Sequence, residues 1–364
     1  MAKIKELISV LEKTVPPSYQ ESWDNSGLIV GNTENEISSV LLTVDVTETV
    51  IDEAIQKNAN FIIAHHPIIF KGLKSLTGKN YVERTIIKAI KKDIAIYAMH
   101  TNLDVFSKGV SYKMAEKLNL NHIETLDIAS GELKKLVVFV PKSHAEKLRL
   151  SLFEAGAGHI GNYDSCSYNT EGLGTFKALS GSKPFVGEIG KLHREEEVRI
   201  EMIFPIHLQN KIVQNLKKEH PYEEVAFDIY SLDQKDSRIG LGKIGELKEA
   251  MDERDFLQVL KTKFNLQNLR FSTLLNKKIK KVAVCGGSCS FLIQKAKTKA
   301  DVFVTADVKY HEFFDAENDL VIVDIGHFES EQYSKDIFYD IISKNFSNFA
   351  IHFSEINTNP INYL

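Results

Sequence analysis

The stretch Phe61-Ile62-Ile63-Ala64-His65-His66-Pro67 joins an apolar run to two adjacent histidines. We expect the run to be a buried strand, and open α/β sheets build their ligand sites at the carboxyl ends of their strands. Neighbouring residues on an extended backbone point to opposite sides, so the two imidazoles are not expected to chelate one ion together. Each can instead bind one of two neighbouring ions. The alternative is a pair of surface histidines at the turn before Pro67.

Two more apolar runs lead to residues of the metal-ligand type. The run 95–99 precedes Asp104, and the run 320–323 precedes Gly326, His327 and Glu331. If a helix begins near Gly326, His327 and Glu331 share one helical face, about 6 Å apart. Three strand ends then supply three histidines and two carboxylates, which are His65, His66, Asp104, His327 and Glu331.

This set exceeds what one tetrahedral zinc ion binds, and it suits two divalent ions about 3.5–4 Å apart that share a carboxylate. Glu331 or Asp104 would bridge the ions, with His65, His66 and His327 as terminal ligands. The sequence leaves open which histidine binds which ion. We expect two zinc ions per chain, and manganese or ferrous iron is also compatible with the mixed nitrogen and oxygen set.

The composition is that of an ordinary globular protein. The chain has 364 residues, of which 43% are hydrophobic and 26% charged, and its formal net charge is −4. This acidic balance disfavours direct binding of nucleic acid. No apolar run approaches the roughly 20 residues of a membrane span, and the first residues are not those of a signal peptide. We therefore expect a cytoplasmic protein that binds neither membranes nor nucleic acid.

The three cysteines, Cys166, Cys285 and Cys289, are too few for a disulfide framework and fit a reducing compartment. Cys285 and Cys289 have the spacing of half a metal site, but no second half follows them. We interpret Cys285 as a small core residue at a strand end, rather than as a ligand.

The pattern along the chain predicts an α/β protein in three parts. Residues 1–128 alternate between helices and strands, and so do residues 239–364. Residues 129–238 contain two strand–helix units with intervening strands, typical of a ferredoxin-like α+β domain, with a glycine-rich stretch over 156–174. Because the expected ligands lie in the first and last parts, those parts must fold together. The middle part is then an insertion into one metal-binding domain.

Motifs along nearly the whole chain resemble those of the NIF-three-like proteins, also labelled GTP cyclohydrolase I type 2 homologues. The outer motifs are Ser22-Trp23-Asp24-Asn25-Ser26-Gly27-Leu28, Ala64-His65-His66-Pro67, His100-Thr101-Asn102-Leu103-Asp104, Thr305-Ala306-Asp307-Val308-Lys309-Tyr310-His311 and Gly326-His327-Phe328-Glu329-Ser330-Glu331. In the middle part, 156–163 and His220-Pro221-Tyr222-Glu223-Glu224 resemble the insert of the longer bacterial members.

The resemblance implies an αβ domain that binds two divalent metals, interrupted by an insert similar to PII or CutA domains. It also implies a homohexamer whose metal sites face an internal cavity. The metal ligands of the family correspond to the same five residues, His65, His66, Asp104, His327 and Glu331. Two positions depart from the family pattern, because Ala306 and Cys289 stand where glycine is usual. If either position needs a positive φ, its loop must be reshaped here.

Several residues are candidates for the reaction or for the surroundings of the ions. Asp45 could orient a ligand histidine or contact substrate, or only cap a helix. His100 could shuttle a proton or pack on its own loop. Lys309 and His311 could contact an anionic substrate, or lie on a solvated helical turn. We expect Trp23 to be a buried anchor rather than a cap over the pocket mouth.

Two classes of function fit these residues. The first is a metal-dependent hydrolase acting on a nucleotide or related small molecule, since paired ions activate water. Taken literally, the family label means GTP, with attack at C8 of guanine and release of formate, although the sequence contains no Walker-type loop. The alternative is a non-catalytic metal-binding or regulatory protein whose PII-like insert senses a ligand.

Overall fold

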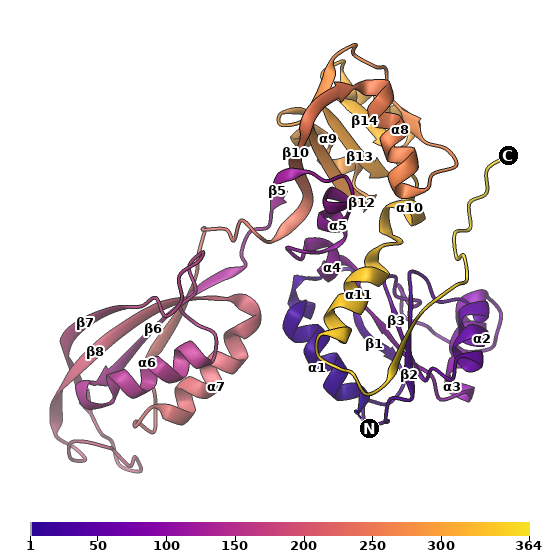
Figure 1. Cartoon of the computed structure of the whole chain (residues 1–364). Helices are drawn as coiled ribbons and strands as arrows, with labels where there is room; N and C mark the ends of the chain where they lie inside the picture. The colour runs from indigo at the N-terminus through magenta and orange to yellow at the C-terminus, as the bar shows by residue number, and fades with distance from the viewer. Residues whose placement is uncertain (1) are drawn as a thin grey trace. The chain divides into compact units, whose positions relative to one another are not determined.

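The computed structural model describes residues 2–364 (Figure 1). These residues divide into two compact units. The larger unit contains the described residues up to Ile128 together with Ser237–Leu364, and the smaller unit is Ala129–Asp236.

A five-stranded sheet of the larger unit has the order β1-β4-β3-β2-β15. The strands are β1 (Gly27–Val30), β2 (Ser39–Thr43), β3 (Phe61–Ala64), β4 (Ala95–Ala98) and β15 (Ala350–Phe353). Strands β4, β3, β2 and β15 are parallel, and β1 is an antiparallel edge strand. Every residue of β3 is buried, as in parallel strands covered on both faces. Strand β15 brings the last part of the chain into the same sheet as the first.

Amphipathic helices cover both faces of this sheet (Figure 1). They are α1 (Ile4–Thr14), α2 (Glu48–Gln56), α3 (Tyr81–Lys91) and α11 (Ser334–Ser343). Helix α1 buries one apolar face, made of Ile4, Leu7, Ile8 and Leu11. These residues pack with the buried side of α11 in one core, while α2 and α3 pack against the opposite face of the sheet.

The second sheet of the larger unit has the order β11-β14-β13-β12-β10-β5. Its strands are β5 (Asn121–Ile128), β10 (Gly240–Asp252), β11 (Arg270–Phe271), β12 (Lys278–Ser288), β13 (Val302–Ala306) and β14 (Val321–Asp324). Strands β12, β13 and β14 are parallel, and the remaining pairs are antiparallel. The helices α5 (Val110–Lys117) and α8 (Glu253–Phe264) contribute to one core beside this sheet, and α9 (Ile293–Lys297) contributes to another.

Two short helices follow strand ends and carry predicted site residues. Helix α4 (Thr101–Val105) follows β4, and α10 (His327–Glu331) follows β14. The predicted helix start near Gly326 is confirmed, because Gly326 is the residue that precedes α10. The chain also forms short 3-10 helices at η1 (Pro17–Tyr19), η2 (Lys142–His144), η3 (Ile206–Leu208), η4 (Ser290–Leu292) and η5 (Tyr310–Ala316).

The smaller unit has a strand–helix–strand–strand–helix–strand order. Its elements are β6 (Leu133–Pro141), α6 (Ala145–Glu154), β7 (Tyr168–Lys177), β8 (Leu192–Pro205), α7 (Gln209–Glu219) and β9 (Phe227–Ser231). The sheet order is β7-β8-β6-β9 with every pair antiparallel, which is a ferredoxin-like arrangement. Strand β7 was not predicted inside the glycine-rich stretch. Its mostly exposed side chains carry no apolar pattern, and its pairing with β8 holds it in the sheet.

Two cysteines differ from their predicted state. Cys285 is buried in the core, but it forms a disulfide with Cys289, with their Cα atoms 6.1 Å apart. The chain turns through Gly286 and Gly287 after the regular part of β12, so the two cysteines come within the distance that a disulfide spans. Cys166 is the free cysteine.

Among the described residues, no helix combines the length and the apolar character needed to cross a membrane.

Gly109 allows the chain to pass from α4 to α5. A Cβ atom at this position would lie 1.7 Å from the carbonyl oxygen of Leu103, inside the helix that carries Asp104. We expect Gly109→Ala to lower the free energy of unfolding by about 1–3 kcal/mol through overpacking. Gly72→Ala is the matched control, since a Cβ there meets nothing within 4 Å. Thermal unfolding of both variants checks this, and equal midpoints would contradict it.

Candidate metal centre

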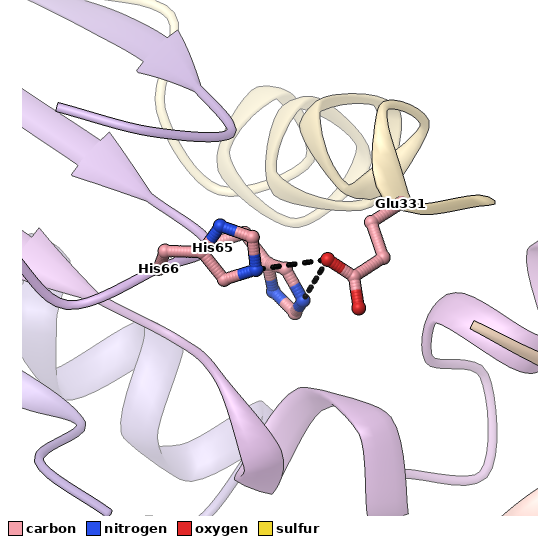
Figure 2. A group of neighbouring side chains, drawn as sticks. All are labelled: His65, His66 and Glu331. Carbon is pink, nitrogen blue, oxygen red and sulfur yellow. Dashed lines mark ion pairs between the residues drawn. The ribbon is translucent and has the colours of Figure 1, made fainter. Parts of the chain in front are cut away.

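Three imidazoles converge on one oxygen of a buried carboxylate. Glu331 Oε2 lies 3.6 Å from Nε2 of His65, 2.8 Å from Nε2 of His66 and 3.0 Å from Nε2 of His327. Figure 2 shows the first two of these pairs. The side chains of His65, His66 and Glu331 are close enough together to hold a metal ion. This part of the site joins the end of β3 to α10.

His65 and His66 do not diverge as they would on an extended strand. Strand β3 ends at Ala64 and the chain bends at the two histidines, which places their ring centroids 4.9 Å apart. Both Nε2 atoms therefore approach the same carboxylate. The expectation of opposite directions is wrong here because it assumed an extended backbone at the two histidines, where the chain bends.

The three histidines His65, His66 and His327 each use the second ring nitrogen, Nδ1, in a contact that fixes the orientation of the ring. His65 Nδ1 lies 2.8 Å from the carbonyl oxygen of Met99, which accepts its proton. The Nδ1 atom of His66 lies 2.7 Å from Asp45 Oδ1, and that of His327 lies 2.6 Å from Asp307 Oδ2. Such partners orient an imidazole and direct its Nε2 lone pair toward an ion.

Asp104 completes the predicted set from α4. Its Oδ1 atom lies 3.7 Å from His65 Nε2. Asp104 Oδ1 and His65 Nε2 are buried and make no hydrogen bond to any described residue, whereas the buried Glu331 Oε2 forms ion pairs with His66 and His327. Buried polar atoms without partners are rare and costly. Because these are also typical ligand atoms for divalent metals, the residues present fit a metal ion.

The charges in the site shift the pKa values of its members. Burial alone would lower the pKa of His66 and of His327. The carboxylates of Asp45 and Glu331 outweigh burial and raise the pKa of His66 to about 10, and those of Asp307 and Glu331 raise the pKa of His327 to about 11. Burial, with the nearby Glu331 charge, raises the pKa of Asp104 to about 7. Burial would also raise the pKa of Glu331, but the surrounding histidines hold it well below its usual range.

The site lies in a cavity of about 610 Å³ within the larger unit. His66, Asp104, His327 and Glu331 form part of its wall, with the loop Gly286–Cys289 beside them. Gly287 has a φ of +69°, and a Cβ atom there would lie 2.3 Å from Glu331 Oε1. The loop can therefore approach the carboxylate this closely because its second residue is glycine.

Aromatic side chains surround the same cavity. Trp23, Phe70 and Phe291 line it and are 61%, 51% and 63% exposed. Trp23 is therefore not the buried anchor that we expected. It packs edge-on to the ring of His100, at a centroid distance of 6.0 Å, and the neighbouring Asp24 accepts hydrogen bonds from the backbone and hydroxyl of Thr101.

The four candidates for the reaction separate into two pairs. Asp45 and His100 line the cavity, with Asp45 bonded to His66 and His100 Nδ1 lying 2.8 Å from Asp24 Oδ1. Lys309 and His311 are exposed residues at the start of η5 and are not among the residues lining the cavity.

Sequence reasoning did not identify several partners of the site. Asp307 contacts His327, and Asp24 contacts His100. Both aspartates belong to motifs that resemble those of the family, at 305–311 and 22–28. Thr358, near the C-terminus, donates a hydrogen bond to Asp45 Oδ2 at 2.7 Å. The aspartates precede or follow strand ends, which was an available signal, whereas nothing near Thr358 in the sequence marks its contact.

The two departures from the family pattern do not distort the site. Positive φ values occur at Asp307 (54°) and Gly287 (69°). Ala306 ends β13 without a positive φ, and Cys289 has a φ of −116°. Neither position therefore requires glycine.

Comparison with known proteins identifies relatives over the whole length. The family model described as Duf34/NIF3 (NGG1p interacting factor 3) matches residues 2–360. A protein of Bacillus subtilis (strain 168), named "GTP cyclohydrolase 1 type 2 homolog", is 41% identical over 366 aligned positions, covering 99% of this chain and 98% of the relative. A protein of Halalkalibacterium halodurans with the same name is 45% identical over 330 positions, covering 90% and 89%.

A solved structure of a Bacillus cereus protein related to NIF3 has the same fold. It is 42% identical to this chain, with a TM-score of 0.87, and the match covers 100% of this chain and 99% of that chain. The predicted resemblance and the mixed α/β fold are confirmed.

Metal uptake is expected to release protons. In the metal-free protein near pH 8, the raised pKa values of about 10 and 11 keep His66 and His327 protonated on both nitrogens. Each must lose its Nε2 proton before it binds an ion, so uptake should release about two protons per chain. Calorimetric titration with zinc in buffers of different ionisation enthalpy measures this number.

The sign of the pH dependence follows from the same shifts. The two histidines contribute stability to the metal-free protein fully below their ordinary pKa of 6.5, and this contribution is lost as the pH rises through about 10 for His66 and about 11 for His327. Apparent zinc affinity should instead increase over that range, because fewer protons compete for the ligands. Uptake without proton release would show that zinc binds elsewhere.

Proposed function

The chain belongs to the Duf34/NIF3 family, and from that premise we propose that it is a hydrolase that uses two divalent metal ions. The observation that carries this proposal is that two buried ligand atoms beside Glu331, His65 Nε2 and Asp104 Oδ1, have no hydrogen-bond partner within residues 2–364. A structural carboxylate–imidazole cluster would satisfy these atoms within the protein. Here these atoms are left without a partner among the residues that the structure describes, and the cluster lies at the wall of a cavity.

We assign the ligands to two groups that share Glu331. His66 Nε2 and His327 Nε2 are 3.4 Å apart, and His65 Nε2 lies 3.7 Å from Asp104 Oδ1. Ligand atoms around one tetrahedral ion, at about 2.1 Å from it, are about 3.4 Å apart. Each pair therefore has a separation suited to one ion, with Glu331 as the bridging carboxylate.

Bound ions at such a site lower the pKa of a water molecule and polarise the bond that it attacks. The protein residues supply orientation around them. Asp45, Asp307 and the carbonyl of Met99 fix the three imidazoles. His100, held by Asp24, lies at the cavity wall where it can contact the substrate.

The substrate that this cavity suits is a nucleotide or a related heterocycle. Its volume of about 610 Å³ is that of a typical small-molecule site. The exposed rings of Trp23, Phe70 and Phe291 offer faces on which a planar base can stack. The name of the relatives, "GTP cyclohydrolase 1 type 2 homolog", makes GTP the first candidate. Hydrolysis of both bonds from C8 to nitrogen would consume two water molecules and release C8 as formate.

Further features follow from the family resemblance and are part of the proposal. We propose zinc as the metal, with manganese or iron as substitutes, a homohexamer as the assembly, and the cytoplasm as the location. The ferredoxin-like unit supports a PII/CutA-like insert over residues 129–238 between two parts of one catalytic domain, 1–128 and 239–364.

The metal assignment is tested by Glu331→Gln, which keeps the side-chain size but removes the shared charge. We expect elemental analysis to find about two ions per wild-type chain and at least a halving of this number in Glu331→Gln. Glu329→Gln on the same short helix is the matched control, because Glu329 Oε1 contacts Asn359 instead of the histidines. Equal metal content in the two variants would contradict the site.

The reaction is tested by measuring formate from GTP with metal-loaded wild-type protein, Glu331→Gln and Glu329→Gln. We expect a loss of about 100-fold or more only in Glu331→Gln, since it removes a group that holds both ions. Metal-loaded protein that releases no formate would contradict GTP as the substrate. If it also failed to hydrolyse other nucleotides, the non-catalytic function would replace the hydrolase.

A further inference from the structure

A second cavity of the larger unit, about 560 Å³ in volume, lies against β5, β10 and the segment between α4 and α5. It shares no lining residue with the metal-site cavity. Lys108, Arg238 and Lys243 line it, together with one carboxylate, Glu124. The two lysines outnumber the one carboxylate of this wall, although the chain as a whole has a net charge of −4.

The ammonium group of Lys243 is unusual among these lining groups because it is buried and has no carboxylate partner in the part of the chain that the structure describes. The residue is 3% exposed, and its position on β10 pairs with Thr125 of β5. Its Nζ donates to Thr125 Oγ1 at 2.9 Å and, at the longer distance of 3.4 Å, to the carbonyl oxygen of Arg238. Among the described residues, no carboxylate forms an ion pair with it. Both recorded partners are neutral, so the buried charge is not compensated.

Buried lysines are normally paired, because an isolated ammonium loses much of its hydration. Burial lowers the pKa of Lys243 to about 8, so the group is still mainly charged at neutral pH. An ammonium group has three donors, and the two recorded bonds leave one for a further acceptor. An anion in the cavity would supply both the missing charge and that acceptor.

We propose that this cavity is a second ligand site, a phosphate pocket that binds a small phosphate-bearing metabolite through Lys243. Lysine binds phosphate as a point charge, and a phosphate monoester carries about two negative charges at neutral pH. The exposed Lys108 adds positive charge to that of Lys243, while Ser107 and Tyr112 bring hydroxyl groups to the same wall. The volume accommodates a phosphorylated small molecule rather than only an ion.

The position of the pocket separates it from the proposed reaction. Helix α4 contributes Asp104 to the metal-site cavity, and the residues that follow it, Ser107 and Lys108, line the phosphate pocket. A ligand held there would contact the segment that leads away from a metal ligand, without entering the site itself. The phosphate pocket does not depend on the proposed hydrolase function.

Inorganic phosphate is the probe for this site, titrated calorimetrically into the full-length protein as purified. We expect Lys243→Met to weaken phosphate binding by about ten- to a hundredfold, since it removes a hydrogen bond to a charged group. Lys248→Met is the matched control, because it removes the same charge from an exposed position of the same strand. It should bind phosphate as the wild type does.

A second variant, Lys108→Met, tests the same pocket in case Lys243→Met fails to fold. Lys108 is exposed, so Lys108→Met is expected to fold normally and to weaken phosphate binding severalfold. Unchanged affinity in both Lys243→Met and Lys108→Met would overturn the proposal and place any bound phosphate at the metal centre. Failure of the wild type to bind millimolar phosphate would also overturn it, as would binding of malonate in preference to phosphate.

Discussion

A single buried carboxylate among three imidazoles is the constraint on which the larger unit depends. Glu331 is almost fully buried, and its Oε2 faces Nε2 of His65, His66 and His327. A buried carboxylate without positive partners would be strongly destabilising. The last part of the chain must therefore bring α10 to the end of β3, and β15 completes that connection by pairing with β2. The candidate metal centre therefore draws its residues from the first and last parts of the chain, which form one unit.

The grouping of the five predicted side chains was predictable because it follows from local geometry. An apolar run that ends in histidines predicts a strand end, and four-residue spacing places His327 and Glu331 on one helical face. The contacts that orient these ligands were less predictable. The carbonyl of Met99 and the hydroxyl of Thr358 reach the site through tertiary packing, which leaves no pattern in the sequence. The turn that lets Cys285 meet Cys289 is likewise visible only in three dimensions.

Errors in the prediction have a common physical origin. The divergence expected for His65 and His66 assumed a regular strand beyond Ala64, and the burial expected for Trp23 assumed that a large apolar ring prefers the core. All three residues lie where the backbone has left regular structure, and His66 and Trp23 line the cavity. Likewise, β7 is held by backbone pairing rather than by an apolar face, so hydrophobic periodicity could not reveal it. General patterns describe the scaffold well and become less accurate at the site.

In the proposed site, Glu331 would be shared by two ions. Anomalous X-ray diffraction from crystals of the protein grown with zinc, recorded on both sides of the zinc absorption edge, can locate them. We expect two anomalous peaks about 3.5–4 Å apart, one beside His65 and Asp104 and the other beside His66 and His327, with the Glu331 carboxylate between them. A single peak, or peaks that do not contact Glu331, would contradict it.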